Sequence, residues 1–129
     1  MNRYARTAKL TITNAEFYGY HGVRAEERSL GGRYQVDAEI EYDASKTVVS
    51  DDISDAVNYE EVLYRIHEHV SGEPYNLIET MAFDIGVAIV ETMPAVHSVT
   101  IRVRKINVPI QQVLDSVQAE ITVQRREKS

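Results

Sequence analysis

Residues 34–42 read Tyr34-Gln35-Val36-Asp37-Ala38-Glu39-Ile40-Glu41-Tyr42, and apolar and polar side chains alternate along the whole segment. Because successive side chains of a β-strand point to opposite faces, this alternation predicts a strand with one buried and one solvated face. Similar alternation predicts three more strands, at residues 8–13, 99–104 and 117–124. A solvated face on each strand favours an antiparallel sheet over a parallel sheet that is covered on both sides.

Between the second and third of these strands the sequence has the period of a helix. From Tyr59 to Val70, apolar residues recur at three- and four-residue spacing, and Asn58 is placed to cap the helix. A second helix is predicted from about Leu77 to Thr92, with Asn76 as its cap. Gly86 lies inside this helix, where it indicates a point of close packing.

The predicted order is β-β-α-α-β-β, which indicates an α+β fold: a four-stranded antiparallel sheet with two helices on one face. We expect one domain over residues 1–124, followed by a polar tail at 125–129. Two connections, Asn14–Gly32 and Lys105–Leu114, are predicted as long loops. Long loops in a compact domain are often functional.

Composition excludes several classes of protein. The chain has 14 Lys and Arg against 20 Asp and Glu, a net charge of −6, so a general nucleic-acid binder is disfavoured. No apolar run approaches the roughly 20 residues that span a membrane, and the first residues do not resemble a secretory signal. We therefore expect a cytoplasmic protein. Because there is no cysteine, thiolate nucleophiles and cysteine-ligated metals are excluded.

Four segments, in this order along the chain, carry a resemblance to a known family. They are Phe17-Tyr18-Gly19-Tyr20-His21-Gly22-Val23 with Glu26 and Glu27 after it, Val57-Asn58-Tyr59, Asn76-Leu77-Ile78-Glu79-Thr80 and Val103-Arg104-Lys105. Together they resemble the dihydroneopterin aldolases, folate-pathway enzymes of the tunnelling-fold superfamily. The resemblance extends from about Leu10 to Ile121.

The resemblance implies a lyase that splits 7,8-dihydroneopterin into 6-hydroxymethyl-7,8-dihydropterin and glycolaldehyde, in some members with epimerisation at C2′. It implies no cofactor and no metal, and a small-molecule pterin as the only ligand. It also implies a homo-octamer of two stacked tetrameric rings, with each active site at a subunit boundary.

Three residues match the family's catalytic positions. Lys105 corresponds to the lysine that takes part in acid–base chemistry, although most lysines at strand ends are merely solvated. Tyr59 corresponds to a tyrosine supplied by a neighbouring subunit, although it could instead pack on the core at the start of its helix. Glu27 corresponds to the glutamate that contacts the substrate tail, and its neighbour Glu26 leaves an ambiguity of one residue.

The remaining matches are to substrate-binding positions. Glu79 corresponds to the family's pterin anchor, because a carboxylate can accept both donors of a guanidine-like edge. With Asn76 as cap, Glu79 could alternatively complete a capping box. By the same resemblance Leu77 and Ile78 form pocket wall or backbone contacts, and Val57 and Asn58 contribute backbone contacts at the pterin rim.

Several alternatives stay open. A catalytic metal is disfavoured, because His67 and His69 are two apart on a predicted helix while His21 and His97 are isolated. The family's lysine is commonly followed by two prolines and a turn that contains glycine. Residues 106–113 have a single proline, Pro109, and no glycine, so the backbone that places Lys105 is less constrained. The rival functions are an epimerase, acting on dihydroneopterin or its triphosphate, and a non-catalytic pterin-binding assembly protein.

Overall fold

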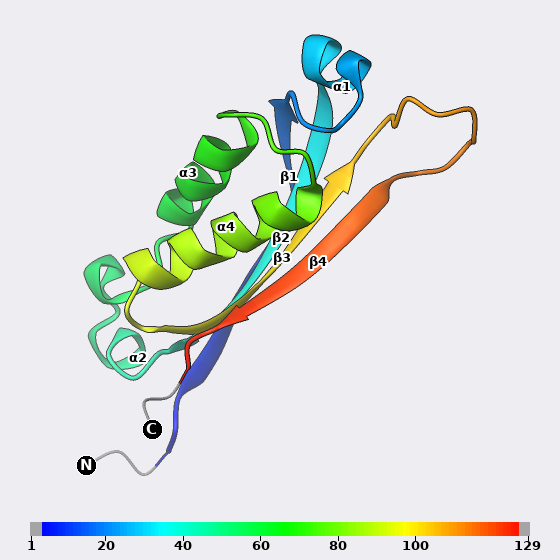
Figure 1. Ribbon diagram of the computed structural model, residues 1–129. Helices are drawn as coiled ribbons and strands as arrows, with labels where there is room; N and C mark the ends of the chain where they lie inside the picture. Colours follow the sequence, from blue (N-terminus) through cyan, green and yellow to red (C-terminus); the bar gives the residue numbers. More distant parts are fainter. Residues whose placement is uncertain (1–3, 127–129) are drawn as a thin grey trace.

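The computed structural model describes residues 4–126 and contains one sheet with two long helices on one of its faces (Figure 1). The strands are β1 (Thr7–Gly19), β2 (Gly32–Asp43), β3 (Val96–Lys105) and β4 (Val117–Gln124). The long helices are α3 (Tyr59–Val70) and α4 (Ile78–Thr92), and short turns of helix form α1 (Ala25–Leu30), α2 (Thr47–Ser50) and η1 (Ile53–Asp55). The predicted α+β fold is confirmed.

All neighbouring strands are antiparallel, in the order β1-β2-β3-β4. β2 pairs with both β1 and β3, and its register places Tyr34 opposite Lys105 and Val36 opposite Val103. Directly opposed residues lie on the same face of a sheet. Tyr34 and Val36 are buried under the helices, so Lys105 also projects from the helix-covered face.

The prediction that Asn14–Gly32 is one long loop is wrong. β1 continues to Gly19, and its register shifts between Ile12 and Ala15, where Asn14 has a positive φ of 55°. The extra residue of this β-bulge breaks the alternation of side chains, so the period-two pattern ends early in the sequence. α1 occupies much of the rest of the predicted loop.

The helices cover the sheet with the apolar faces that their periodicity predicts. Asn58 caps α3 as expected, because its side-chain oxygen accepts a hydrogen bond from the Glu60 N–H at 2.9 Å. α4 packs against β3 and β4, and Gly86 allows a close approach to Val123. The core combines alternate residues of the strands with one stripe of each helix, including Val36, Ala38, Ile40, Val62, Ile66, Met81, Ile85, Ile89, Val99 and Ile101.

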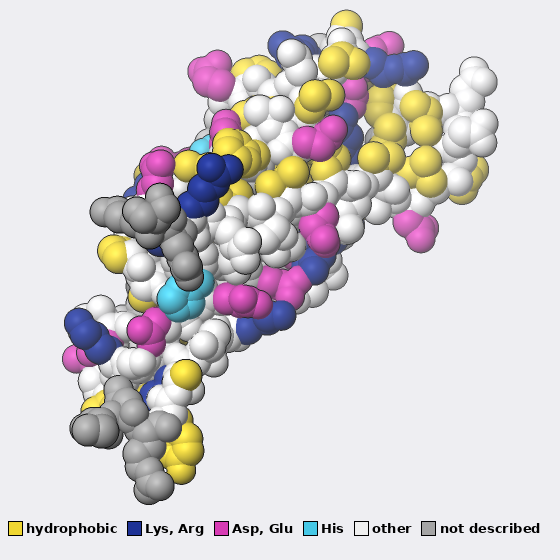
Figure 2. Space-filling view, turned by 60° about the horizontal axis from the view of Figure 1, so that its bottom comes forward, with side chains coloured by type: hydrophobic (Ala, Val, Ile, Leu, Met, Phe, Trp, Pro, Cys, Tyr) yellow, Lys and Arg dark blue, Asp and Glu magenta, His cyan; other side chains and the backbone are white. Residues whose placement is uncertain are grey.

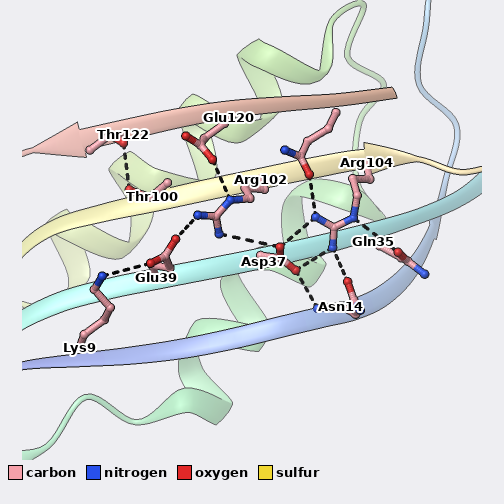
Figure 3. Close-up of polar contacts among 11 residues, drawn as sticks. Lys9, Asn14, Gln35, Asp37, Glu39, Thr100, Arg102, Arg104, Glu120 and Thr122 are labelled. Carbon is pink, nitrogen blue, oxygen red and sulfur yellow. Dashed lines mark hydrogen bonds and ion pairs between the residues drawn. The ribbon is translucent and has the colours of Figure 1, made fainter. Parts of the chain in front are cut away.

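The other face of the sheet carries a network of ion pairs across all four strands (Figure 3). At its centre the Arg104 guanidinium donates to both oxygens of Asp37, at 2.9 and 2.7 Å, and the Asn14 N–H donates to Oδ1 at 2.8 Å. These hydrogen bonds hold the pKa of Asp37 below its ordinary value of 3.8. Beside them, Arg102 joins Glu39 to Glu120, and Lys9 donates to Glu39.

The chain after β4 begins with a residue that is anchored to the domain. Arg125 donates through its backbone to the His97 carbonyl at 3.0 Å and through Nη2 to the Val90 carbonyl at 2.6 Å. The last three residues of the predicted polar tail, 127–129, lie outside the described residues. Within residues 4–126 every helix is too short or too polar to cross a membrane.

Replacing Asp37 with Asn should make the stability less dependent on pH. At neutral pH we expect Asp37→Asn to lower the free energy of unfolding by roughly 1–3 kcal/mol, because Arg104 loses its charged partner. Since the pKa of Asp37 is depressed in the folded protein, this contribution is complete above its ordinary value of 3.8 and is lost as the pH falls below it. Urea unfolding from pH 7 downward measures the difference. A difference that stays constant into the acid range would contradict the assignment, and Glu91→Gln, at an exposed carboxyl on α4, is the control.

Replacing Gly86 with Ala should destabilise the fold although alanine is the better helix former. A Cβ at position 86 would lie 2.7 Å from Val123 Cγ2 and 3.3 Å from Val123 Cβ. The propensity gain of about 1 kcal/mol is then outweighed by overpacking, and we expect a net loss of roughly 1 kcal/mol. In a double-mutant cycle, Val123→Ala should relieve this loss. Additive effects of the two substitutions would show that Val123 is not the cause.

Candidate functional site

The last residue of β3 forms an ion pair with α1. Lys105 Nζ donates to Glu27 Oε2 at 2.9 Å, and the two side chains are only 18% and 11% exposed. Partial removal of both charges from water makes their attraction stronger than that of an ordinary surface pair. Lys105 is therefore held in a fixed place by a carboxylate, and it is not a freely solvated lysine at a strand end.

The loop before α1 is shaped to hold the Glu27 carboxylate. Gly22 has a φ of 127°, which a residue with a side chain rarely adopts, and a Cβ there would collide with the Glu27 carboxylate. Glu27 Oε1 also accepts a hydrogen bond from the Arg24 N–H at 3.4 Å. Glu26 is exposed, and it is Glu27 that forms the ion pair with Lys105, so the geometry favours Glu27 between the two neighbours.

Glu79 and Lys105 line the same hollow, which lies between the start of α4 and the start of β4. This hollow has a volume of about 450 Å³ and is lined by residues 76–79, Lys105 and residues 117–120. Lys105 also lines a second hollow on the side of α1, together with Glu27, Tyr34 and residues 106–109. A molecule that fills this hollow can therefore contact both Glu79 and Lys105.

The start of α4 differs from the predicted cap at Asn76, and the alternative of a capping box completed by Glu79 is also not realised. The helix begins at Ile78, Leu77 occupies the cap position without a side-chain cap, and Glu79 is the second helical residue. Asn76 does not cap the helix, because its Oδ1 accepts a hydrogen bond from Arg28 Nη2. The Glu79 carboxylate is exposed and remains available to a ligand at a helix end that favours anions. Ile78 is buried, whereas Leu77 is half exposed at the rim of the hollow.

The structure does not bring Val57, Asn58 and Tyr59 to this end of the molecule. They lie at the start of α3, whereas the end of α3 lies near the loop that precedes α1 (Figure 1). A helix of 12 residues is about 18 Å long, so Tyr59 is far from Lys105 of its own chain. Val57 is buried in the core, Asn58 caps α3, and the Tyr59 side chain is 54% exposed.

The loop after Lys105 is long, as predicted, and it is anchored near the lysine. The Ile106 N–H donates to the Arg33 carbonyl at 3.0 Å, which continues the β2–β3 ladder, and Arg24 Nη1 donates to the Pro109 carbonyl at 2.7 Å. Hydrophobic side chains gather at this end of the molecule (Figure 2). The exposed ones from this loop and its surroundings are Leu77, Ile110, Val113, Leu114 and Val117.

Sequence reasoning missed the arginines that fix the loops around the site. Besides the contact of Arg24 with Pro109, Arg28 Nε donates to the Gly22 carbonyl at 2.7 Å, and its Nη2 reaches Asn76. Neither arginine belongs to a periodic pattern, and the contacts with Pro109 and Asn76 join segments far apart in the sequence. Among residues 4–126, His, Asp and Glu side chains form no group of three that could hold a metal ion.

Comparison with known proteins places this geometry in a family. The model of the family described as FolB: Dihydroneopterin aldolase matches residues 10–122. Dihydroneopterin aldolase of Bacillus subtilis (strain 168) is 40% identical over 114 residues, which cover 88% of this chain and 95% of that protein.

Solved structures agree with the sequence comparison. A crystal structure from Vibrio cholerae assigned as dihydroneopterin aldolase (FolB) superposes with a TM-score of 0.79 at 26% identity, covering 92% of this chain and 98% of that one. Escherichia coli dihydroneopterin aldolase in complex with neopterin shares the fold, with a TM-score of 0.78 at 21% identity over 90% of this chain and 98% of that one. The chain belongs to the dihydroneopterin aldolase family.

Proposed function

We propose that this chain is a dihydroneopterin aldolase, a lyase that cleaves 7,8-dihydroneopterin into 6-hydroxymethyl-7,8-dihydropterin and glycolaldehyde. The observation that carries the proposal is the fixed Lys105–Glu27 pair at the edge of the hollow that contains Glu79, in a chain of this family. The proposal includes the cytoplasmic location expected from the sequence.

Glu79 is proposed to hold the pterin ring. The 2-amino group and N3–H of a pterin are two parallel donors, and a carboxylate accepts both in a bidentate arrangement. Glu79 is exposed at the rim of the hollow, and the first-turn N–H groups of α4 point toward the same region. Leu77 and Ile78 supply wall and backbone contacts beside it.

The reaction then needs proton transfers and little else from the protein. When the C2′ hydroxyl loses its proton, the C1′–C2′ bond breaks and C2′ becomes the aldehyde carbon of glycolaldehyde. The bonding electrons move to C1′ and into the adjacent C6=N5 bond, which gives an enamine, and protonation of C1′ completes the hydroxymethyl product. The substrate supplies its own electron sink, so the proposal requires neither a metal nor a lysine imine.

In its ion pair with Glu27, Lys105 is an ammonium, which cannot itself accept a proton, so it is proposed to hold the water molecule that relays the proton away from the C2′ hydroxyl. Glu27 is proposed to contact the hydroxyl groups of the substrate tail, since its carboxylate already lies 2.9 Å from Lys105 Nζ. A tail that reaches Lys105 from a ring bound at Glu79 also reaches Glu27. The pair therefore positions the leaving part of the substrate.

Tyr59 is proposed to act in the active site of a neighbouring copy. It is exposed about one helix length from Lys105 of its own chain, and in the neighbouring site its hydroxyl would assist protonation of the enamine. Asn58 and Val57 would contribute backbone contacts to the same pterin. A shared site requires assembly, and we propose two stacked tetrameric rings, a homo-octamer, whose contacts include the exposed hydrophobic residues beside the loop after β3.

The rival functions are not favoured. The relatives described above are named aldolases, which favours neither an epimerase specific for the triphosphate nor a non-catalytic pterin-binding protein. Epimerisation at C2′ remains compatible with the proposed chemistry, since re-addition of glycolaldehyde to the enamine can invert that carbon.

The proposed reaction can be tested directly. Purified protein incubated with 7,8-dihydroneopterin should release glycolaldehyde at an undiminished rate in the presence of a chelator, because no proposed step uses a metal ion. Both products are followed by chromatography, with the triphosphate assayed in parallel. Loss of cleavage with the chelator would contradict the metal-free route, and turnover of the triphosphate alone would favour the epimerase.

Two substitutions should separate turnover from binding. Lys105→Ala should lower kcat by about 10²- to 10⁴-fold with little change in pterin affinity, because it removes the group that holds the proton-relaying water. Glu79→Ala should weaken pterin binding by roughly 10²-fold, since two charge-assisted hydrogen bonds are lost. Kinetics and ligand titration measure the two effects, with Lys46→Ala and Glu91→Gln as controls at exposed positions. The reverse pattern would overturn the assigned roles.

A further inference from the structure

A buried histidine lies behind the proposed site, and the proposed reaction does not use it. The His21 side chain is 1% exposed and makes two hydrogen bonds with its ring nitrogens. Nε2 lies 2.6 Å from the carbonyl oxygen of Val70, at the end of α3, and Nδ1 lies 2.9 Å from the N–H of Tyr75. We refer to His21, the Val70 carbonyl and the Tyr75 N–H as the His21 junction.

The partners of the His21 junction determine the protonation state of the ring. A carbonyl oxygen can only accept, so Nε2 must carry a hydrogen, and a backbone N–H can only donate, so Nδ1 must be bare. Only the neutral Nε2–H imidazole satisfies both partners. A proton added at Nδ1 would face the Tyr75 N–H, donor against donor, in a buried place.

The His21 junction ties together the segments that carry the two proposed binding carboxylates. The Gly22 N–H donates to the Tyr75 carbonyl at 2.8 Å, so both backbone groups of Tyr75 bond to residues 21 and 22. Arg28 adds a second tie, from the Gly22 carbonyl to Asn76. Glu27 follows Gly22 on one side, and Glu79 follows Asn76 on the other.

The same histidine also contacts the strand that positions Lys105. The Tyr34 hydroxyl donates to the His21 carbonyl at 3.2 Å, and the two rings pack edge to face with centroids 5.3 Å apart. Tyr34 lies directly opposite Lys105 in the β2–β3 register. His21 therefore contacts the loop that precedes Glu79 and the strand that pairs with the end of β3 at Lys105, and it lies in the loop that leads to Glu27.

We propose that His21 is a positioning residue for the reaction: as a neutral imidazole it fixes the separation of Glu27, Glu79 and Lys105 without touching the substrate. The inference rests on the proposed function for the identity of the reaction. The geometry of the His21 junction is independent of it.

Low pH should disrupt the His21 junction, because protonation would place a positive charge on a buried ring that lies near two other cations. Burial is the main cause that lowers the pKa of His21 below 6.5, and Lys105 on β3 and Arg28 on α1 lower it further, whereas the Val70 carbonyl favours the charged form. The other titratable neighbours are Tyr34 on β2, Tyr75 in the loop before α4, and Glu27 on α1, which faces Tyr34. Because the pKa of His21 is depressed in the folded protein, the contribution of neutral His21 to the free energy of unfolding is complete above pH 6.5. This contribution falls as the pH drops from 6.5 toward the pKa of His21 in the folded protein.

The protonation state can be measured in the intact protein, whatever reaction it catalyses. Nitrogen-15 NMR of the histidine side chains should show His21 with a protonated Nε2 and a bare Nδ1, unchanged as the pH is lowered through 6.5. His97 is exposed, and its separate signals serve as the internal reference for the assignment. A His21 ring that is protonated at Nδ1, or that gains a second proton as the pH passes through 6.5, would overturn the proposal.

Kinetics test the positioning role. His21→Gln can keep the donor to the Val70 carbonyl but has no acceptor where Nδ1 lies, and His21→Phe keeps neither. Per folded protein, we expect kcat/KM to fall by roughly 10- to 100-fold for Gln and further for Phe, with kcat and KM both changed, because displaced groups serve both binding and turnover. The loss of activity that accompanies protonation of His21 in acid should be absent from both variants, and His97→Gln should match the parent.

Arg28→Gln keeps the test decisive if the His21 variants do not fold. It removes the second tie at an exposed position, and we expect a smaller change in the same direction in kcat and KM. Unchanged kcat, KM and pH profile in a folded His21 variant would show that the junction only supports the fold, and unchanged kcat and KM in Arg28→Gln would show that fixing these two loops does not serve the reaction. Absence of dihydroneopterin cleavage by the parent protein would instead refute the proposed function and leave the NMR result standing.

Discussion

The register between β2 and β3 is the constraint on which the site depends. Tyr34 lies opposite Lys105, and Gln35 lies opposite Arg104, so Lys105 projects from the helix-covered face and Arg104 from the solvated one. Side chains alternate along a strand, and a slip of one residue would exchange the two. The register is secured on both faces, because Val36 and Val103 pack in the core while Asp37 binds Arg104 outside it. The ion pairs of the outer face thus help to determine which basic side chain reaches the hollow.

The helix layer places the residues of the proposed reaction at two opposite ends of the domain. α4 starts beside the end of β3, which brings Glu79 to the same hollow as Lys105. α3 has its last residue near His21 and its first residue at the opposite end of the helix, so Tyr59 lies far from that hollow. Because α3 is a continuous helix of 12 residues, its two ends stay about 18 Å apart. An active site that uses both ends therefore has to be completed by another copy.

Much of this arrangement could be predicted from the sequence, and the failures have physical causes. The sheet and the helices were predictable, because burial of one face produces both the alternation from Tyr34 to Tyr42 and the helical stripe from Val62 to Val70. The bulge at Asn14 was not, because one added residue reverses the alternation of those that follow. Asn76 has the composition of a helix cap, but its side chain instead bonds Arg28, which is 48 residues away in the sequence. Pairings of this kind depend on the tertiary fold, and no local pattern indicates them.

We propose that one chain supplies Lys105 and a second chain supplies Tyr59 to each active site, and mixed oligomers test this sharing most directly. Lys105→Ala and Tyr59→Phe proteins would be denatured together, refolded together and assayed, with each variant refolded alone as reference. With random mixing, about one quarter of the sites would combine both intact residues, so activity should recover to roughly a quarter of the parent value. Activity of the mixture no greater than the average of the two variants, in oligomers shown to contain both chains, would contradict a site shared between copies.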